Sequence, residues 1–181
     1  MKNTKSELFS WIKSIFFALL VAFICRHFIF SPVTVFGESM KPTFEDQNKL
    51  IVTKISKIDR FDMIVFDAPD SNENYIKRVI GLPGDKVEMK NDTLYINGKK
   101  YKEPYLKTNK EGIASDEKLT GDFDLMSLLG KSVVPKNSLF VMGDNRRWSK
   151  DSRIFGFISK DSVIGKVQLR YYPIKEIGAP K

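Results

Sequence analysis

An apolar run near the N-terminus constrains this chain more than any other feature. Residues Leu8 to Phe30 read LFSWIKSIFFALLVAFICRHFIF, and the eleven residues from Ile15 to Cys25 are all apolar. Eleven residues are too few to cross a bilayer, which takes about 20. Adding Leu8 to Ser14 lengthens the stretch and includes Lys13, whose side chain can reach the headgroups from near a helix end. We therefore predict a transmembrane anchor over residues 8–30.

Three other interpretations of this run are weaker. A cleaved signal peptide would show a small-x-small site after the apolar residues, and CRHFIFSP contains none. A core helix of a small domain would have a polar side, whereas this run is apolar all round with basic residues at both ends. An interfacial helix would also need a polar face, which Ile15–Cys25 lacks. An uncleaved anchor is favoured.

The charges beside the anchor set its expected orientation. Lys2, Lys5 and Lys13 precede the apolar residues 15–25 and are opposed by Glu7, whereas Arg26 and Lys41 follow them. The positive-inside rule therefore favours, by a small margin, a short cytoplasmic N-terminus of residues 1–7. Residues 31–181 would then form a domain on the extracytoplasmic face of the cell membrane, held by a single span.

Composition excludes several classes of site. The chain has 181 residues, a net charge of +8, one Cys and one His. Cys25 alone can form neither an internal disulfide nor a cysteine-rich zinc site. His27 is the only imidazole and lies inside the predicted anchor, so imidazole chemistry is not expected. The positive charge is spread thinly, without the basic patch that nucleic-acid binding needs. We predict no metal, no cofactor and no nucleic-acid partner.

Beyond Pro32 the sequence changes to short segments with strand composition. Asn97-Gly98, between TLYI and KKY, is a strong signal for a two-residue hairpin. Soluble amphipathic helices of four turns are not evident. Five segments are rich in β-branched or aromatic residues: Leu50–Ile58, Phe61–Asp67, Tyr75–Gly81, Ser138–Gly143 and Val163–Tyr172. We predict a mainly β fold, in which one N-terminal transmembrane helix precedes an antiparallel β-sheet catalytic domain with a small inserted lobe.

The predicted lobe is indicated by a change in composition. Residues Lys107–Lys131 are polar, with few strand-forming residues before a short FDLMSLL run. A segment of this kind between two β-rich halves is typical of an insertion. We expect the lobe to cover about residues 90–136.

Two segments contain candidate catalytic groups. GESMKPTF (Gly37–Phe44) places Ser39 just after the anchor, and an ordinary turn serine is its simplest interpretation. YIKRVIGLPGD (Tyr75–Asp85) places Lys77 inside an apolar, strand-like run. Such a lysine commonly lies at an edge, but burial can also lower its pKa until the neutral amine acts as a base.

A third segment, GDNRRWSKDSRIFG (Gly143–Gly156), follows a predicted buried strand directly. It contains two Asp, one Asn, three Arg, one Lys and two Ser in fourteen residues. A charged surface loop is the ordinary interpretation. However, charges next to a buried strand are costly unless they are paired. Asp144 and Asp151 could pair with Arg78 and Arg153 to form a scaffold around a site.

In order and spacing, the three segments resemble the conserved boxes of bacterial type I signal peptidases (leader peptidases). The third fits the family pattern GDN-R-x-x-S-x-DSR-x-x-G at every fixed position. With the anchor, the resemblance covers most of the chain, and only about residues 90–136 match no motif. One box alone would be weak, but three together are very specific.

The resemblance implies roles for individual residues. Ser39 would be the nucleophile, and Lys77 the general base that takes its proton and later protonates the leaving amine. Ser149 would orient the Lys77 amine by a hydrogen bond. A Ser-Lys pair is a known variant of the serine-protease arrangement. One position departs from the family: Gly37 stands where some members carry a serine that helps to hold the oxyanion.

The resemblance also implies a scaffold and a binding site. Asp144 would pair with Arg78, and Asp151 with Arg153. The residues at the family's pockets for small side chains at substrate positions −1 and −3 are Val35, Met40, Tyr75 and Ile76.

We therefore predict a membrane-anchored serine endopeptidase that removes signal peptides from secretory preproteins, with membrane lipid around its anchor. Self-cleaving repressors share the chemistry but are soluble. Two alternatives remain. One is a specialised paralogue for surface-fibre assembly, and the other is a non-catalytic anchored β-domain that binds a partner protein or a polyanion. The non-catalytic alternative does not explain why all three boxes occur together.

Overall fold

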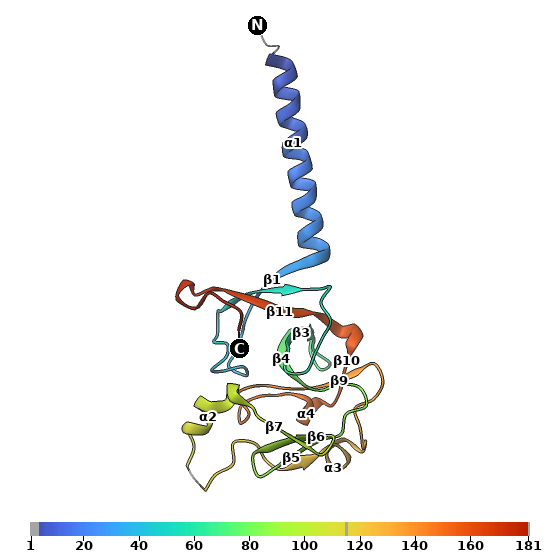
Figure 1. Ribbon diagram of the computed structural model, residues 1–181, viewed down its shortest axis with the longest axis vertical. Coiled ribbons are helices and arrows are strands. Elements are labelled where there is room, and N and C mark those ends of the chain that lie inside the picture. Colours follow the sequence, from blue (N-terminus) through green and yellow to red (C-terminus); the bar gives the residue numbers. More distant parts are fainter. Residues whose placement is uncertain (1–3, 115, 181) are drawn as a thin grey trace.

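The apolar run forms one long helix that extends away from the rest of the molecule (Figure 1). The computed structural model describes residues 4–114 and 116–180, so the first three residues of the predicted N-terminus lie outside it. Helix α1 (Thr4–Ile24) continues into a π-helical turn at Cys25–Ile29. Within the described residues, Glu7–Ile29 is the one helical stretch long and apolar enough to cross a membrane, judged by length and composition.

A seven-stranded antiparallel sheet follows the helix and confirms the predicted fold class (Figure 1). The helical segment ends one residue before the predicted boundary, because the backbone of Phe30 pairs with that of Thr53. In spatial order the strands are β1 (Phe30–Thr34), β2 (Lys49–Thr53), β11 (Val163–Tyr172), β3 (Met63–Asp67), β4 (Asn74–Gly81), β9 (Ser138–Met142) and β10 (Ile158–Ser159).

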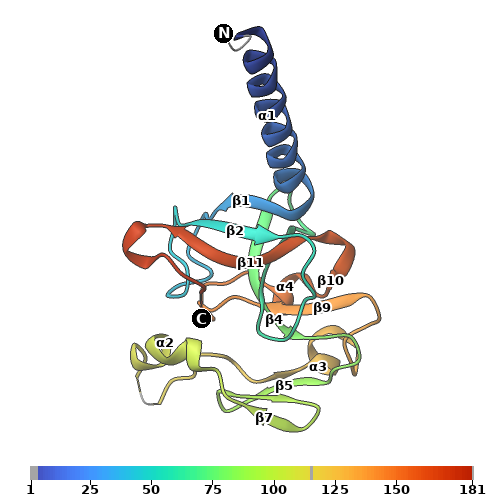
Figure 2. The ribbon, with the colours of Figure 1, turned by 45° about the horizontal axis from the view of Figure 1, so that its top comes forward.

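A second, four-stranded antiparallel sheet lies at the end of the molecule away from α1 (Figure 2). The predicted hairpin is present: Asn97 and Gly98 both have positive φ, at 54° and 75°, as its tight turn requires. We call residues 87–129, which contain this sheet and two short helices, the inserted lobe. Its strands in spatial order are β7 (Lys99–Tyr101), β6 (Thr93–Ile96), β5 (Val87–Lys90) and β8 (Phe123–Asp124).

The remaining α-helices are short, and two of the three are capped by side chains. They are α2 (Lys107–Glu111), α3 (Leu125–Leu129) and α4 (Ser152–Phe155). The Asp124 side chain caps α3 by accepting hydrogen bonds from two backbone N–H groups of its first turn. Asp151 caps α4 in the same way through Arg153 N–H. Carboxylates favour these positions because the first N–H groups of a helix have no partner within it.

Apolar side chains join the lobe to the main sheet. Ile80, Phe140 and Met142 from β4 and β9 pack in one buried cluster with apolar residues of the lobe, among them Val87 and Leu94. Removing this much apolar surface from water is the main stabilising contribution that holds the two sheets together. The lobe is therefore part of the same packed body.

Two predicted strands were too long. The first, Leu50–Ile58, ends at Thr53 in the structure, opposite Phe30, where the partner strand begins. The second, Phe61–Asp67, begins at Met63, because Phe61 has a φ of 70° and lies in a turn. Apolar composition alone did not reveal where the pairing partner ends.

Candidate active site

Ser39 lies in a turn that follows β1 and leads away from the anchor. Gly37 has a φ of 83°, a backbone conformation that side chains other than glycine rarely adopt. Its N–H donates a hydrogen bond to Asp46 Oδ1 at 2.9 Å. The turn is closed by Lys41 N–H, which donates to the Glu38 carbonyl oxygen at 3.1 Å. The sequence places Ser39 at the tip of a tightly folded turn.

Lys77 lies in the middle of β4, and only 4% of its surface is exposed. Its Nζ is 2.6 Å from Ser39 Oγ, which is hydrogen-bond distance. The same Nζ lies 5.2 Å from the centre of the Tyr75 ring. The structure thus brings together the two residues that the sequence singled out as nucleophile and base.

Burial lowers the pKa of Lys77 from its ordinary 10.5 to about 8. Loss of water around the ammonium group is the main cause, since a charge is poorly solvated inside a protein. The negative charges of Asp151 and Asp144 act in the opposite direction and raise the pKa, but less strongly. The neutral amine is therefore far more accessible near neutral pH than in an exposed lysine.

Arg78, the next residue of β4, pairs with Asp144 as predicted. The contact is bidentate, with Nε 2.9 Å from Oδ1 and a terminal nitrogen 2.6 Å from Oδ2. Both side chains are buried, and Thr43 Oγ1 adds a 2.5 Å hydrogen bond to Oδ2. A buried carboxylate is tolerated because its oxygens are satisfied in this way.

Asp151 and Arg153 form the second predicted pair, again with two contacts of 2.8 Å. Asp151 also accepts a hydrogen bond from Gly143 N–H at 3.0 Å. One carboxylate therefore fixes the beginning and the end of the charged segment, which runs from Gly143 to α4. Arg153 holds the middle by donating to the Arg146 carbonyl oxygen at 2.8 Å.

Ser149 does not make the predicted contact in this structure. Its Oγ is buried and has no hydrogen-bond partner among the described residues. A role in orienting the Lys77 amine therefore stays a prediction. Gly143 lies against this hydroxyl so closely that an added Cβ would overlap with Ser149 Oγ and with the Ser39 carbonyl oxygen. Glycine is required at this position because no side chain fits.

The four predicted substrate-binding residues share one cleft with Ser39 and Lys77. The cleft has a volume of about 770 Å³, and its walls include Val35, Met40, Tyr75 and Ile76. Two large exposed side chains, Phe36 and Trp148, lie at its edge. Neither residue was predicted from the sequence to line the cleft.

Several residues that hold the site together were missed from the sequence. Asn145 N–H donates to the Ser39 carbonyl oxygen at 3.0 Å, and its side chain donates to the Glu38 carbonyl oxygen at 3.1 Å. Arg146 is buried and donates to the Gly143 carbonyl oxygen at 3.0 Å. Both residues lie inside the charged segment, so their place in the motif was the available signal. Within residues 4–114 and 116–180, no group of His, Cys, Asp or Glu is arranged to hold a metal ion.

Comparisons with known proteins point to a single family. A family model described as "Signal peptidase, peptidase S26" matches residues 8–172. The chain is 51% identical over 165 residues to signal peptidase I of Bacillus caldolyticus, covering 89% of this chain and 90% of the relative. It is 46% identical over 180 residues to signal peptidase IB of Staphylococcus aureus, covering 95% and 93%.

A solved structure is also similar. The crystal structure of a signal peptidase I from Enterococcus faecalis matches with a TM-score of 0.61 and 45% sequence identity, covering 62% of this chain and 98% of that one. The family match extends over most of the chain, including all three sequence boxes and the residues gathered around Ser39 and Lys77. The chain therefore belongs to the signal peptidase family, peptidase S26.

Proposed function

We propose that this chain is a membrane-anchored serine endopeptidase that removes N-terminal signal peptides from translocated preproteins, with Ser39 as nucleophile and Lys77 as general base. The observation that carries the proposal is the 2.6 Å separation between Lys77 Nζ and Ser39 Oγ in a chain of this peptidase family. A serine hydroxyl needs a base beside it to become a useful nucleophile. A buried lysine with a pKa of about 8 meets that need.

The reaction follows from this geometry. The neutral Lys77 amine takes the proton of the Ser39 hydroxyl while Oγ attacks the carbonyl carbon of the scissile peptide bond. Lys77 then gives the proton to the departing amine as the C–N bond breaks, which leaves an acyl ester on Ser39. In the second half, Lys77 takes a proton from a water molecule as the water oxygen attacks the ester carbonyl carbon. Lys77 then returns this proton to Ser39 Oγ as the ester C–O bond breaks, which releases the signal peptide with a free carboxyl end and restores both groups. At pH 7 roughly a tenth of a lysine with this pKa is neutral, against well under a thousandth of an exposed one.

The oxyanion needs hydrogen-bond donors. In the part of the chain that the structure describes, no group accepts a hydrogen bond from Ser39 N–H, so this N–H can donate to the oxyanion. Gly37 cannot serve in the same way through its backbone, since its N–H is bonded to Asp46. The Ser39 backbone is therefore the donor that we assign.

The cleft explains the expected preference for small residues. Val35, Met40, Tyr75 and Ile76 line it beside the reacting pair and give this part of its wall an apolar surface. Because apolar pockets discriminate by volume, side chains larger than the space would be rejected at −1 and −3. Preproteins with small residues at these positions are the substrates that we propose.

The place of the cleft in the chain supports a membrane-bound substrate. Its walls begin at Pro32, two residues after Phe30, and Ser39 is at most ~30 Å of extended chain from Phe30. We propose that residues 1–7 are cytoplasmic, residues 8–30 span the membrane, and residues 31–181 lie on the extracytoplasmic face. A nucleophile tethered at this distance can meet a signal peptide that is itself embedded in the bilayer.

The purified full-length chain in lipid-supplemented detergent tests this proposal. It should cut a preprotein with alanine at −1 and −3, and N-terminal sequencing of the product should place the cut after the −1 residue. A matched preprotein with phenylalanine at −1 should stay uncut. If the folded chain cuts neither preprotein, the non-catalytic anchored domain or the specialised paralogue becomes the better account.

A further inference from the structure

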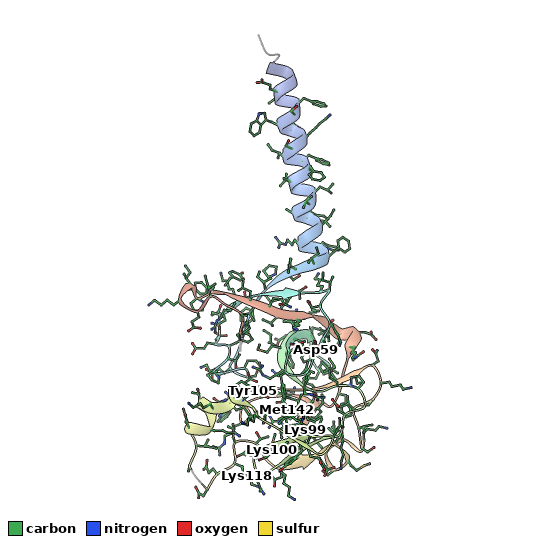
Figure 3. All side chains as sticks on the ribbon, viewed as in Figure 1. Asp59, Lys99, Lys100, Tyr105, Lys118 and Met142 are labelled. Atoms are coloured by element: carbon green, nitrogen blue, oxygen red, sulfur yellow. The ribbon has the colours of Figure 1, made fainter. Side chains whose placement is uncertain are left out.

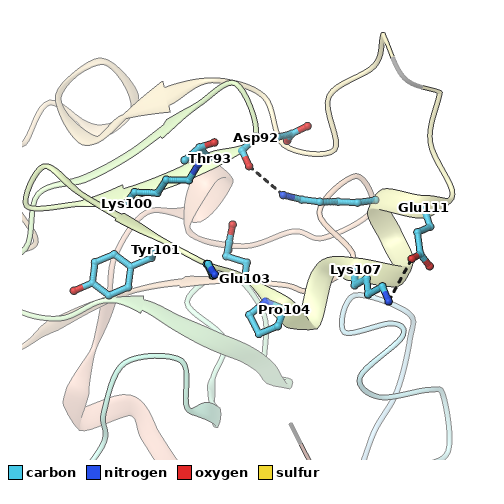
Figure 4. A pocket seen from close by; sticks show the side chains of 10 residues that line it. Asp92, Thr93, Lys100, Tyr101, Glu103, Pro104, Lys107 and Glu111 are labelled. Atoms are coloured by element: carbon cyan, nitrogen blue, oxygen red, sulfur yellow. Dashed lines mark hydrogen bonds and ion pairs between the residues drawn. The ribbon is translucent and has the colours of Figure 1, made fainter.

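Helix α2 of the inserted lobe presents two different faces. Its outer face contributes Lys107, Lys110 and Glu111 to a cleft of about 510 Å³ between α2 and the β6–β7 hairpin (Figure 4). There Lys110 Nζ donates to the Asp92 carbonyl oxygen at 3.1 Å, a contact within the lobe. Asn109 does not line this cleft. Its side chain contacts another part of the molecule.

The Asn109 amide joins two segments of the candidate active site. Its Nδ2 donates to the Lys41 carbonyl oxygen at 3.1 Å and to the Asp144 carbonyl oxygen at 2.7 Å. Lys41 lies two residues after Ser39, in the same turn. Asp144 is the second residue of the charged segment and pairs with Arg78. One side chain of the lobe therefore uses both amide hydrogens to tie the Ser39 turn to the charged segment.

A second set of contacts fixes the lobe against the same segment. Arg146, which is 2% exposed, pairs with Glu103 of the lobe. It also lies 3.3 Å from Thr120 Oγ1. Tyr105 donates to Glu103 at 2.7 Å, and its ring stacks on the Arg78 guanidinium at 3.9 Å. Figure 3 shows Tyr105 between the two sheets. Buried contacts of this kind make the lobe a firm support for Asn109.

The contacts of Asn109 bear on the distance between the reacting atoms. The Ser39 turn rests on the charged segment through Asn145 N–H, while Lys77 is fixed in the sheet. Any movement of the turn away from the charged segment moves Ser39 Oγ relative to Lys77 Nζ. Small misplacements of reacting groups, caused by residues that never touch the substrate, can cost up to about 100-fold in rate.

We propose that Asn109 is a positioning residue for peptide cleavage, through which the inserted lobe holds the Ser39 turn in register with the charged segment. The proposal rests on the function proposed above, because it assumes that Ser39 and Lys77 react. It gives the lobe, which matches none of the sequence boxes, a defined part in the reaction.

Three variants of the full-length chain test the proposal by steady-state cleavage. Asn109→Leu keeps the size of the side chain but has no donor, and it should lower kcat by roughly 10- to 100-fold with KM changed less than about twofold. Asn109→Gln keeps the amide and should recover a substantial part of kcat. Lys110→Ala, on the outer face of the same helix, is the matched control and should cleave like the unchanged chain.

Amide hydrogen exchange, measured without substrate, is a second test and does not depend on cleavage activity. In Asn109→Leu the Lys41 and Asn145 N–H groups should exchange faster, while the strands of the main sheet and the Lys110→Ala control stay as protected as before. If the unchanged chain does not cleave preproteins, the proposed function fails, and exchange still decides whether Asn109 holds the turn.

Two results would overturn the inference. One is an Asn109→Leu variant with unchanged kcat and unchanged exchange at both amides. The other is failure of both Asn109→Leu and the smaller Asn109→Ala to fold, because Asn109 would then support the fold as a whole instead of positioning the site.

Discussion

Lys77 Nζ and Ser39 Oγ lie 2.6 Å apart, although one residue is buried in the middle of a strand and the other lies in a turn outside the sheet. The strand removes the amine from water and so lowers its pKa to about 8. The turn keeps the hydroxyl at the wall of a cleft that a peptide can enter. The proposed base and nucleophile thus meet at the boundary between the protein core and the cleft, where each has the surroundings that its proposed task needs.

The rate of cleavage should depend on the protonation of Lys77. Because the reaction needs the neutral amine, kcat/KM should rise with pH and level off above a midpoint near 8. The pH profile of cleavage of a short peptide substrate measures this midpoint. His27→Gln should give the same profile, and a midpoint that disappears in this variant would show that imidazole is the base.

Burial of Lys77 should lower the free energy of unfolding. Its pKa is lower in the folded chain than in the unfolded chain, so the unfolded chain binds more protons between about pH 8 and 10.5. The free energy of unfolding therefore rises with pH across this window, and the full penalty, roughly 3 kcal/mol, applies below pH 8. Lys77→Met should raise the thermal midpoint at pH 7 while it abolishes cleavage. A lower midpoint for this variant at pH 7 would contradict the assigned penalty.

Gly143 should not tolerate a side chain. In Gly143→Ala the new Cβ overlaps with Ser149 Oγ and the Ser39 carbonyl oxygen, so the Ser39 turn must shift. We expect a loss of about 2 kcal/mol in the free energy of unfolding and a large loss of activity. Denaturant unfolding and preprotein cleavage measure the two effects. Gly121→Ala is the control, since its Cβ would meet no atom within 4 Å. Equal behaviour of the two variants would show that the packing at Gly143 is looser than described.

Ile76 should limit the size of the substrate side chain that the cleft accepts. Ile76→Ala shortens a side chain in the wall of the cleft and so enlarges the space beside Lys77. Preproteins with valine or leucine at −1 or −3 should therefore be cut better, relative to preproteins with alanine there. We expect the ratio of kcat/KM values to change by about 10-fold or more, because removed methylene groups in a pocket are worth about 1–3 kcal/mol. The control is Ile154→Ala, at an exposed isoleucine outside the cleft. An unchanged ratio in Ile76→Ala would remove this residue from the specificity site.

Local signals were sufficient for much of the fold, whereas the reacting pair was assigned through the resemblance of three sequence boxes to a known family. The uninterrupted run from Ile15 to Cys25 predicted the long helix, and Asn97-Gly98 predicted the hairpin between β6 and β7. A two-residue turn of this kind needs positive φ at both residues, and Asn-Gly is the pair that adopts it readily, so the sequence alone revealed the turn. The ion pairs of Asp144 and Asp151 were predictable because charges beside a buried strand need partners.

Contacts between distant segments could not be predicted in the same way. Nothing near Asn109 in the sequence indicates that its amide reaches Lys41 and Asp144, since this depends on how the lobe packs on the main sheet. The same is true of the buried pair between Glu103 and Arg146. Polar composition marked this region as an insertion, but composition does not tell which polar side chains turn inward.

The central claim, that Ser39 and Lys77 act as nucleophile and base, is tested most directly by cleavage with Lys77→Arg and Ser39→Ala beside the unchanged full-length chain. Arginine keeps the positive charge but stays protonated, so it cannot take the proton of the serine hydroxyl. We predict that both variants fold, insert into lipid and lose at least about 1,000-fold in cleavage rate. Full activity in Lys77→Arg would contradict the general-base assignment, and full activity in Ser39→Ala would contradict the nucleophile.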